Sequence, residues 1–187
     1  MSRLLLTTVL LLCSLPLLGQ EPPWLYQKCY GTGTVLITSA TPNLGGTIEV
    51  AVRSILSPLD VVPPEDPLAG KLVFRTVTPA PNPMTPLVPV TVVLHDVDKY
   101  AMEKPFVATF AGPATAHIGF LRKGIKGILE VTIADLRDPT DALSPNQTQF
   151  DMVKVTFTPE NVTTPYLLQW EGIVWKGDLV VFERLGR

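Results

Sequence analysis

The amino-acid sequence predicts an all-β protein, built as a single antiparallel β-sandwich with little helix. Apolar and polar residues alternate with a period of two over most of the chain, most clearly in residues 46–56, and this period sends successive side chains to opposite faces of a strand. The alternating segments are rich in Val, Ile, Thr, Phe and Trp, which pack well on a pleated surface. Apolar residues at helical spacing are nearly absent, which argues against a mostly helical fold.

Residues 1–19 predict a signal peptide. One cation, Arg3, precedes a nearly unbroken apolar run over residues 4–12, and the segment ends at Gly19. This run is shorter than the roughly 20 apolar residues that a membrane-spanning helix needs, so a cleaved leader is favoured over an anchor. Lipidation at Cys13 is the alternative, although the apolar run continues beyond this residue. We therefore expect a secreted or periplasmic protein without a transmembrane anchor after cleavage.

Residues 20–187 are expected to form one domain, because a chain of this size buries enough surface for one stable core. The whole chain has 15 basic and 17 acidic residues without a concentrated basic cluster, which argues against a nucleic-acid partner. Cys29 is the only cysteine after the leader, so the mature chain has no internal disulfide. We expect Cys29 to be buried, with a free thiol that pairs with another chain as the alternative.

Ten segments have the pattern of strands. Short helical turns are expected only near residues 98–103 and 140–143. Lys176 and Gly177 separate the last two strands, and Gly at the second turn position permits the positive φ of a tight hairpin. The ten predicted strands are residues 34–39, 46–56, 71–78, 88–95, 106–111, 116–121, 128–134, 151–158, 166–175 and 179–184.

Two proline-rich segments, near residues 57–69 and 78–89, connect predicted strands. Proline fixes φ and lacks an N–H, so it suits stiff surface connections. We interpret both segments as crossovers of a Greek-key sandwich, which predicts immunoglobulin-like or jelly-roll connectivity. A closed β-barrel is the alternative architecture, and a division into two small β units near residues 79–86 is the alternative domain organisation.

Histidine is scarce, with only His95 and His117 in the chain, and this limits acid–base and zinc chemistry. His95, Asp96 and Asp98 stand together at a predicted strand end, where three polar groups can converge on a divalent metal. A solvated strand end explains the same residues. A metal-dependent secreted enzyme would require them to meet His117 or the acidic turn that follows the strand at residues 128–134.

That turn contains Asp135, Asp138 and Asp141. Hard oxygen ligands gathered on a loop suit calcium, which is plentiful outside cells. The glycine-centred spacing of a calcium loop is missing, so a solvated turn is the simpler interpretation. Calcium is therefore the one cofactor that the sequence offers, and no other cofactor is predicted.

Motifs for nucleophilic hydrolysis and phosphate binding are missing from the sequence. There is no Gly-x-Ser-x-Gly elbow, and the glycines at Gly31 and Gly33 precede a predicted strand rather than a helix, so they offer no helix N-terminus to an anion. Two glycosylation sequons, at Asn146 and Asn161, fall in or beside predicted loops.

Three aromatic residues, Trp24, Tyr26 and Tyr30, lie close together near the mature N-terminus. Aromatic side chains combine an apolar body with a polar tip and are common on recognition surfaces. Core or edge packing is the alternative role. These three residues are the candidate binding residues of the sequence.

The sequence favours a non-catalytic extracytoplasmic module that binds a protein, a glycan or a cell surface through its loops, because rigid β scaffolds commonly carry recognition there. Two other classes are weighed against it. One is the metal-dependent enzyme that uses His95, Asp96 and Asp98, and the other is a β-barrel carrier of an apolar ligand. No pattern in the sequence indicates an oligomeric state.

Overall fold

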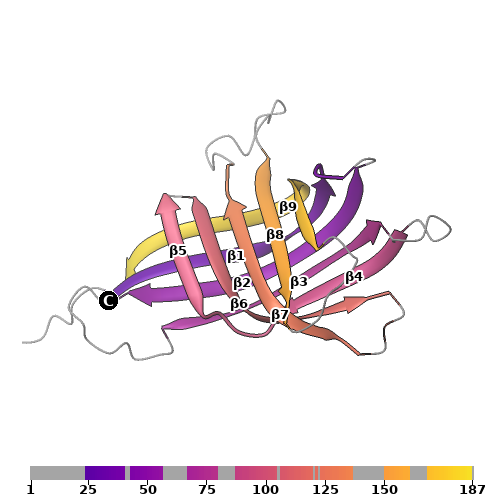
Figure 1. Cartoon of the computed structure of the whole chain (residues 1–187). Helices are drawn as coiled ribbons and strands as arrows, with labels where there is room; N and C mark the ends of the chain where they lie inside the picture. The colour runs from indigo at the N-terminus through magenta and orange to yellow at the C-terminus, as the bar shows by residue number, and fades with distance from the viewer. Residues whose placement is uncertain are drawn as a thin grey trace, which may run out of the picture.

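The computed structural model describes residues 24–40, 43–56, 67–79, 87–104, 106–119, 121, 123–136, 150–160 and 168–186. These residues form nine β-strands and no helix (Figure 1). The strands are β1 (Trp24–Ile37), β2 (Leu44–Leu56), β3 (Leu68–Pro79), β4 (Leu87–Leu94), β5 (Lys99–Lys104), β6 (Val107–Ile118), β7 (Ile125–Ala134), β8 (Asp151–Pro159) and β9 (Gln169–Gly186).

All nine strands belong to one antiparallel sheet with the order β4-β3-β2-β1-β9-β8-β7-β6-β5. An additional pairing of β4 with β6 makes the sheet curl back on itself. In Figure 1, β5 to β8 form a front layer that crosses β9, β1, β2 and β3 behind it at a steep angle. The prediction of an all-β antiparallel fold is therefore confirmed, with nine strands in place of ten.

The connectivity differs from the immunoglobulin-like and jelly-roll patterns that the prolines suggested. Strands that follow one another in the chain are neighbours in the sheet, apart from β4 and β5, which both pair with β6. The two proline-rich segments connect the paired strands β2 and β3, and β3 and β4, so they are not crossovers. Proline makes a connection stiff without deciding its path, and residues 57–66 and 80–86 lie outside the described residues.

Strand β6 is continuous, although residues 106–111 and 116–121 were expected to be two strands. Its first half pairs with β5 and its second half pairs with β4 along the same edge. Pro113 lies where the partner changes, so its missing N–H costs no ladder hydrogen bond. Gly112 is required beside it, because a Cβ at this position would overlap the carbonyl oxygen of Asp96.

Strand β9 is also continuous, which corrects the hairpin predicted at Lys176 and Gly177. Its register against β1 shifts at Trp175, which is the extra residue of a β-bulge. Gly177 does adopt a positive φ of 101°, but this conformation belongs to the bulged strand rather than to a turn. The bulge reverses the alternation of faces, so Val174 and Leu179 are both fully buried although four residues lie between them, which in a regular strand would place them on opposite faces.

Two shorter predictions are also corrected. Residues 98–103 were expected to form a helical turn, but residues 99–104 form strand β5 because they pair with β6. Strand β1 begins at Trp24, ahead of the predicted start at residue 34. Gly31 and Gly33 interrupt the apolar pattern there, and both permit a close approach to β9. The helical turn predicted at residues 140–143 and the two sequons lie outside the described residues.

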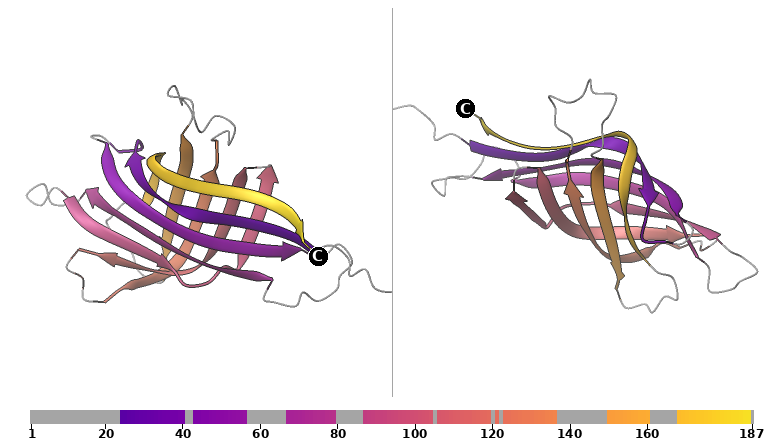
Figure 2. Two further views of the ribbon diagram at one scale, coloured as in Figure 1. Left: turned by 180° about the vertical axis from the view of Figure 1, so that it is seen from behind. Right: turned by 90° about the horizontal axis from the view of Figure 1, so that it is seen from above.

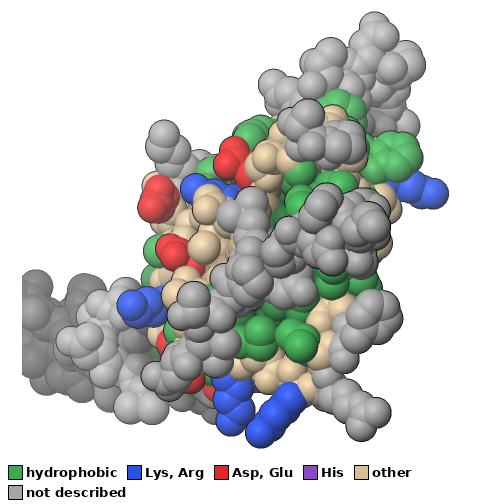
Figure 3. Space-filling view, turned by 45° about the vertical axis from the view of Figure 1, so that its right-hand side comes forward, with side chains coloured by type: hydrophobic (Ala, Val, Ile, Leu, Met, Phe, Trp, Pro, Cys, Tyr) green, Lys and Arg blue, Asp and Glu red, His purple; other side chains and the backbone are tan. Residues whose placement is uncertain are grey.

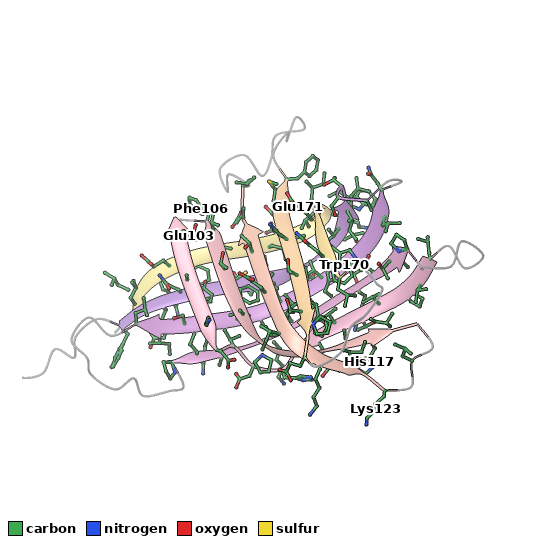
Figure 4. The ribbon with its side chains drawn as sticks, in the orientation of Figure 1. Glu103, Phe106, His117, Lys123, Trp170 and Glu171 are labelled. Carbon is green, nitrogen blue, oxygen red and sulfur yellow. The ribbon has the colours of Figure 1, made fainter. Side chains whose placement is uncertain are left out.

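One hydrophobic cluster fills the space between the layers. It takes residues from eight strands, and its side chains include Phe74, Phe110, Leu129 and Val155, each at most 1% exposed. The rings of Phe74 on β3 and Trp170 on β9 lie 5.4 Å apart between centroids, and Figure 4 shows Trp170 within the fold. Cys29 belongs to the same cluster with no exposed surface, which confirms the expectation that it is buried.

Candidate functional site

The outer face of the layer formed by β9, β1, β2 and β3 carries aromatic and basic side chains. Cys29 on β1 faces the core, and side chains alternate along a strand, so Tyr26, Lys28 and Tyr30 face outward. Figure 2, left, views the molecule from this side and shows β9, β1 and β2 running side by side. A ligand can therefore meet side chains from several strands on this face.

The strand register determines which side chains are neighbours here. In three successive rows across the sheet, a residue of β1 stands between its partners on β9 and β2, and β3 extends two of the rows. We call the outward residues of these rows the aromatic–basic face. The rows are Arg184, Tyr26 and Ile55; then Phe182, Lys28, Arg53 and Ala69; then Val180, Tyr30, Ala51 and Lys71. Ile55, at the end of the first row, is only 3% exposed.

A shallow hollow of about 520 Å³ lies over the aromatic–basic face. Three of its lining residues, Ala51, Ala69 and Gly70, have little or no side chain and leave space between larger neighbours. The rest of the lining includes the rings of Tyr30 and Phe182 and the cations Lys28, Arg53 and Arg184. The hollow thus combines apolar surface with positive charge.

Ring contacts hold part of this surface in place. Tyr30 and Phe182 stand edge to face, with their centroids 5.8 Å apart and their planes at 89°. The guanidinium carbon of Arg184 lies 5.9 Å from the centroid of the Tyr26 ring, which is a cation–π arrangement. Tyr30 is still 47% exposed, so its ring remains accessible to a ligand.

The charge pattern changes beyond this hollow. The next row along β1 contains Asp178, Thr32 and Glu49, and the row after it contains Lys176, Thr34, Thr47 and Arg75. A second hollow of about 360 Å³ is lined by Thr32, Thr34, Glu49, Arg75 and Lys176, among others. The outer face is therefore basic over the first hollow and of mixed charge over the second.

The three candidate binding residues that the sequence indicated, Trp24, Tyr26 and Tyr30, lie on β1. Tyr26 and Tyr30 belong to the aromatic–basic face, whereas Trp24 is only 6% exposed and pairs with the last residue of β9, Gly186. The sequence did not single out Lys28, which lies between the two tyrosines on β1, or Phe182, Arg53 and Arg184, which lie on other strands. Only the strand register, which a local pattern does not reveal, brings them beside Tyr30.

The three candidate metal ligands His95, Asp96 and Asp98 do not converge on one site. His95 Nε2 lies 2.8 Å from Thr115 Oγ1, and Asp96 Oδ1 accepts a hydrogen bond from the N–H of Val97 at 2.8 Å. Asp98 is exposed. Among the residues that the structure describes, no group of three His, Cys, Asp or Glu side chains could hold a metal ion.

Among the described residues, neither His117 nor Asp135 completes a group of three metal ligands with His95, Asp96 and Asp98. Figure 4 shows His117 towards the opposite end of β6 from Phe106, and Asp135 forms a backbone contact with Phe106, whose carbonyl accepts its N–H at 2.7 Å. Asp138 and Asp141 lie outside the described residues, so calcium binding at the turn stays a prediction.

Two carboxylates accept backbone N–H groups on the edge of β9 that no longer pairs with β8. β9 extends past its last partner on β8, Asp151, which is paired with Val174. Beyond this point Asp151 Oδ2 accepts the N–H of Leu179 at 3.0 Å, and Asp135 Oδ2 accepts the N–H of Val181 at 3.1 Å. These side chains replace a neighbouring strand, because buried N–H groups need acceptors.

These carboxylates also affect Cys29. Burial, together with the negative charges of Asp135 and Asp151, raises the pKa of the Cys29 thiol to about 12. Burial likewise raises the pKa of Tyr100 above its usual range, with smaller contributions from Cys29 and Glu183. The thiol is thus neutral near pH 7 and unsuited to nucleophilic catalysis, which needs the thiolate.

The inner face of β1 becomes polar towards its N-terminal end. Gln27 stands between Ser54 and Glu183 in the register, and its Nε2 donates to Glu183 Oε2 at 2.7 Å. The next row contains Leu25, with Leu56 46% exposed and Leu185 70% exposed.

On the side seen in Figure 3, exposed hydrophobic side chains gather in patches with basic side chains near their margins.

The chain matches no protein-family model, and neither the curated proteins nor the solved structures gave a significant match. Within the part of the chain that the structure describes, no helix is long and apolar enough to cross a membrane. The geometry of the side chains therefore supplies the argument for function.

Proposed function

We propose that this protein is a non-catalytic extracytoplasmic binding module that recognises its ligand through the aromatic–basic face. The observation that supports it is the meeting of the exposed Tyr30 ring, Phe182 and three cations from three strands around one hollow. Recognition is thus assigned to a sheet face instead of the loops that the sequence favoured.

Rigid strands suit this role. Side chains on paired strands keep their relative positions, and a surface that is already organised loses little conformational entropy on binding. Aromatic and Arg residues are the types that most often dominate binding energy. The sequence supports the extracytoplasmic location through the signal peptide predicted in residues 1–19, and N-terminal sequencing of the exported protein tests that location.

Variants of the face test the proposal directly. The mature chain, residues 20–187, is titrated with gellan, polygalacturonate, dextran, oligothymidylate and poly-L-glutamate, and affinity is measured by calorimetry. At least one polymer is expected to bind, and Tyr30→Ala is expected to weaken that binding about tenfold, because truncating an aromatic residue that contributes strongly to an interface costs more than about 1 kcal/mol.

Trp175→Ala is the matched control. Trp175 is 56% exposed, but it is not among the residues that line either hollow, so its loss should leave affinity unchanged. Circular dichroism melting curves establish that both variants are folded. The proposal is wrong if no polymer binds, or if Tyr30→Ala and Trp175→Ala bind equally well.

A further inference from the structure

We propose that the ligand is an acidic polysaccharide whose carboxylates are separated by neutral sugars, and that it lies along β1 across both hollows. This inference rests on the proposed function and adds the chemical class of the ligand. It is carried by the order of charges along the outer face of β9, β1, β2 and β3.

Charge complementarity selects an anion at the first hollow. Its lining contains Lys28, Arg53 and Arg184 and no acidic residue among the described lining positions, and Lys71 continues the row of Tyr30. The whole chain nevertheless carries a net charge of −2. Basic residues are thus concentrated here against the overall charge, and the planar guanidinium groups match the geometry of a carboxylate.

The aromatic rings select a sugar over a purely ionic ligand. The face of an aromatic ring carries negative partial charge, and the C–H groups on one side of a sugar ring are apolar and weakly positive. Tyr30 is exposed for such a contact and is held edge to face by Phe182. A sugar ring can therefore stack on Tyr30 while its carboxylate reaches the neighbouring cations.

We call the row of Asp178, Thr32 and Glu49 the acidic row. It favours a polyanion with widely separated charges over one with a charge on every unit. Thr32 stands between Asp178 and Glu49, two residues beyond Tyr30, which is about 7 Å along a strand. A nucleic-acid strand carries a negative charge about every 3.4 Å, so it would bring phosphates next to Glu49. A neutral sugar instead offers hydroxyl groups that can donate to this carboxylate.

The last row favours a second anion. Lys176, Thr34 and Arg75 lie in the row that follows, within the lining of the second hollow. The order of the rows along β1 is thus basic, acidic and basic again. A chain with acidic sugars at both ends of the face and neutral sugars between them matches this order.

Polymers that differ only in the spacing of charge test the inference. Gellan has neutral sugars between its carboxylates, polygalacturonate carries a carboxylate on every sugar, dextran is uncharged, and oligothymidylate carries a phosphate at every nucleotide. Gellan is expected to bind at least about tenfold more tightly than each of the others, and its affinity should fall with added salt because exposed charges are screened.

Single variants are expected to change the affinities in different directions, which a general loss of stability would not do. Glu49→Gln is expected to strengthen polygalacturonate binding about threefold, since an exposed like-charge contact is worth less than about 1 kcal/mol. Arg184→Gln is expected to weaken gellan binding several-fold. Lys154→Gln, on the exposed side of β8, removes a cation from the other layer and should leave both affinities unchanged.

The outcomes separate this inference from the proposed function. If dextran, oligothymidylate, polygalacturonate or poly-L-glutamate binds as tightly as gellan and Tyr30→Ala still weakens it, the inference is wrong and the proposed function stands. If Glu49→Gln leaves the preference for gellan over polygalacturonate unchanged, the acidic row does not act as argued and the inference also falls. If Tyr30→Ala affects no binding, both fail.

Discussion

The inner and outer faces of β9, β1 and β2 are built from alternate residues of the same strands, yet around Cys29 they differ in polarity, charge and exposure. The row of Cys29, Val52 and Val181 on the inner face is at most 3% exposed. Its neighbour on the outer face holds Phe182, Lys28 and Arg53. One step along the backbone thus separates a packed core from a charged hollow.

This difference shows how much depends on the register. A shift of one residue in a paired strand would move every side chain to the other face. The same register therefore determines both the aromatic–basic face and the core. The bulge at Trp175 is the one place where β9 changes this alternation against β1. It lets the first half of β9 pack with β8 while the second half keeps Leu179 and Val181 inside.

The largest expected effect comes from a pair of neighbours on β3 that face opposite ways. Phe74 has no exposed surface and contacts Trp170 across the core, so Phe74→Ala should lower the free energy of unfolding by about 3–5 kcal/mol. Val73→Ala, on the outer face, should cost less than about 1 kcal/mol. Urea denaturation measures both, and similar losses would contradict the assignment of faces.

A smaller effect is expected at the bulge. Gly177 has a positive φ, and a Cβ at this position would overlap the carbonyl oxygen of Thr32, so Gly177→Ala should destabilise the fold by about 1–3 kcal/mol. At Gly45 a Cβ would meet no atom within 4 Å, which makes Gly45→Ala the matched control. Equal melting temperatures for the two variants would show that β9 has no bulge at this point.

The smallest effect on stability depends on pH. The folded state holds the pKa of Cys29 at about 12, above its ordinary value of 9.0, so the unfolded chain loses the thiol proton first as pH rises. The contribution of this thiol to stability is fully present well below pH 9 and is lost as pH rises from about 9 to about 12. At pH 10 the loss is on the order of 1 kcal/mol, and Cys29→Ala should remove this part of the alkaline decline.

Parallel decline of the wild type and Cys29→Ala between pH 9 and pH 11 would mean that the thiol titrates alike in both states. Cys29 would then lie at the surface, and the inner and outer faces of β1 would have been exchanged. Chemical unfolding at a series of pH values provides the measurement, with the variant at pH 7 as the reference for the loss of the side chain itself.

Local patterns predicted the strands well where alternation is unbroken. Residues 46–56 and 151–158 match β2 and β8 closely, because one buried face leaves a period of two in the sequence. The predictions failed at Gly112 and Gly177, where glycine usually marks a turn. Here each glycine instead permits the close approach of another backbone, which only the folded chain reveals.

The candidate site was only half visible in the sequence. Tyr26 and Tyr30 stood out because they lie close together in the chain. Lys28 and Arg184 became candidate binding residues only because the pairing of β1 with β9 places Phe182 beside Lys28 and Arg184 beside Tyr26. The same limit affected the acidic turn, where Asp135 looked like a metal ligand. Its carboxylate instead accepts the N–H of Val181 at the open edge of β9, a contact with a residue far along the chain.

The most direct test of the account is whether a ligand covers the floor of the first hollow. Ala51 lines it and is exposed, so Ala51→Cys in a Cys29→Ser background offers one thiol there, and Lys154→Cys in the same background is the control on the other layer. Iodoacetamide should label both thiols in the free protein, and saturating gellan should slow labelling several-fold at position 51 alone. Equal labelling rates with and without gellan at position 51, or a thiol there that never reacts, would contradict the assignment of this face as the binding surface.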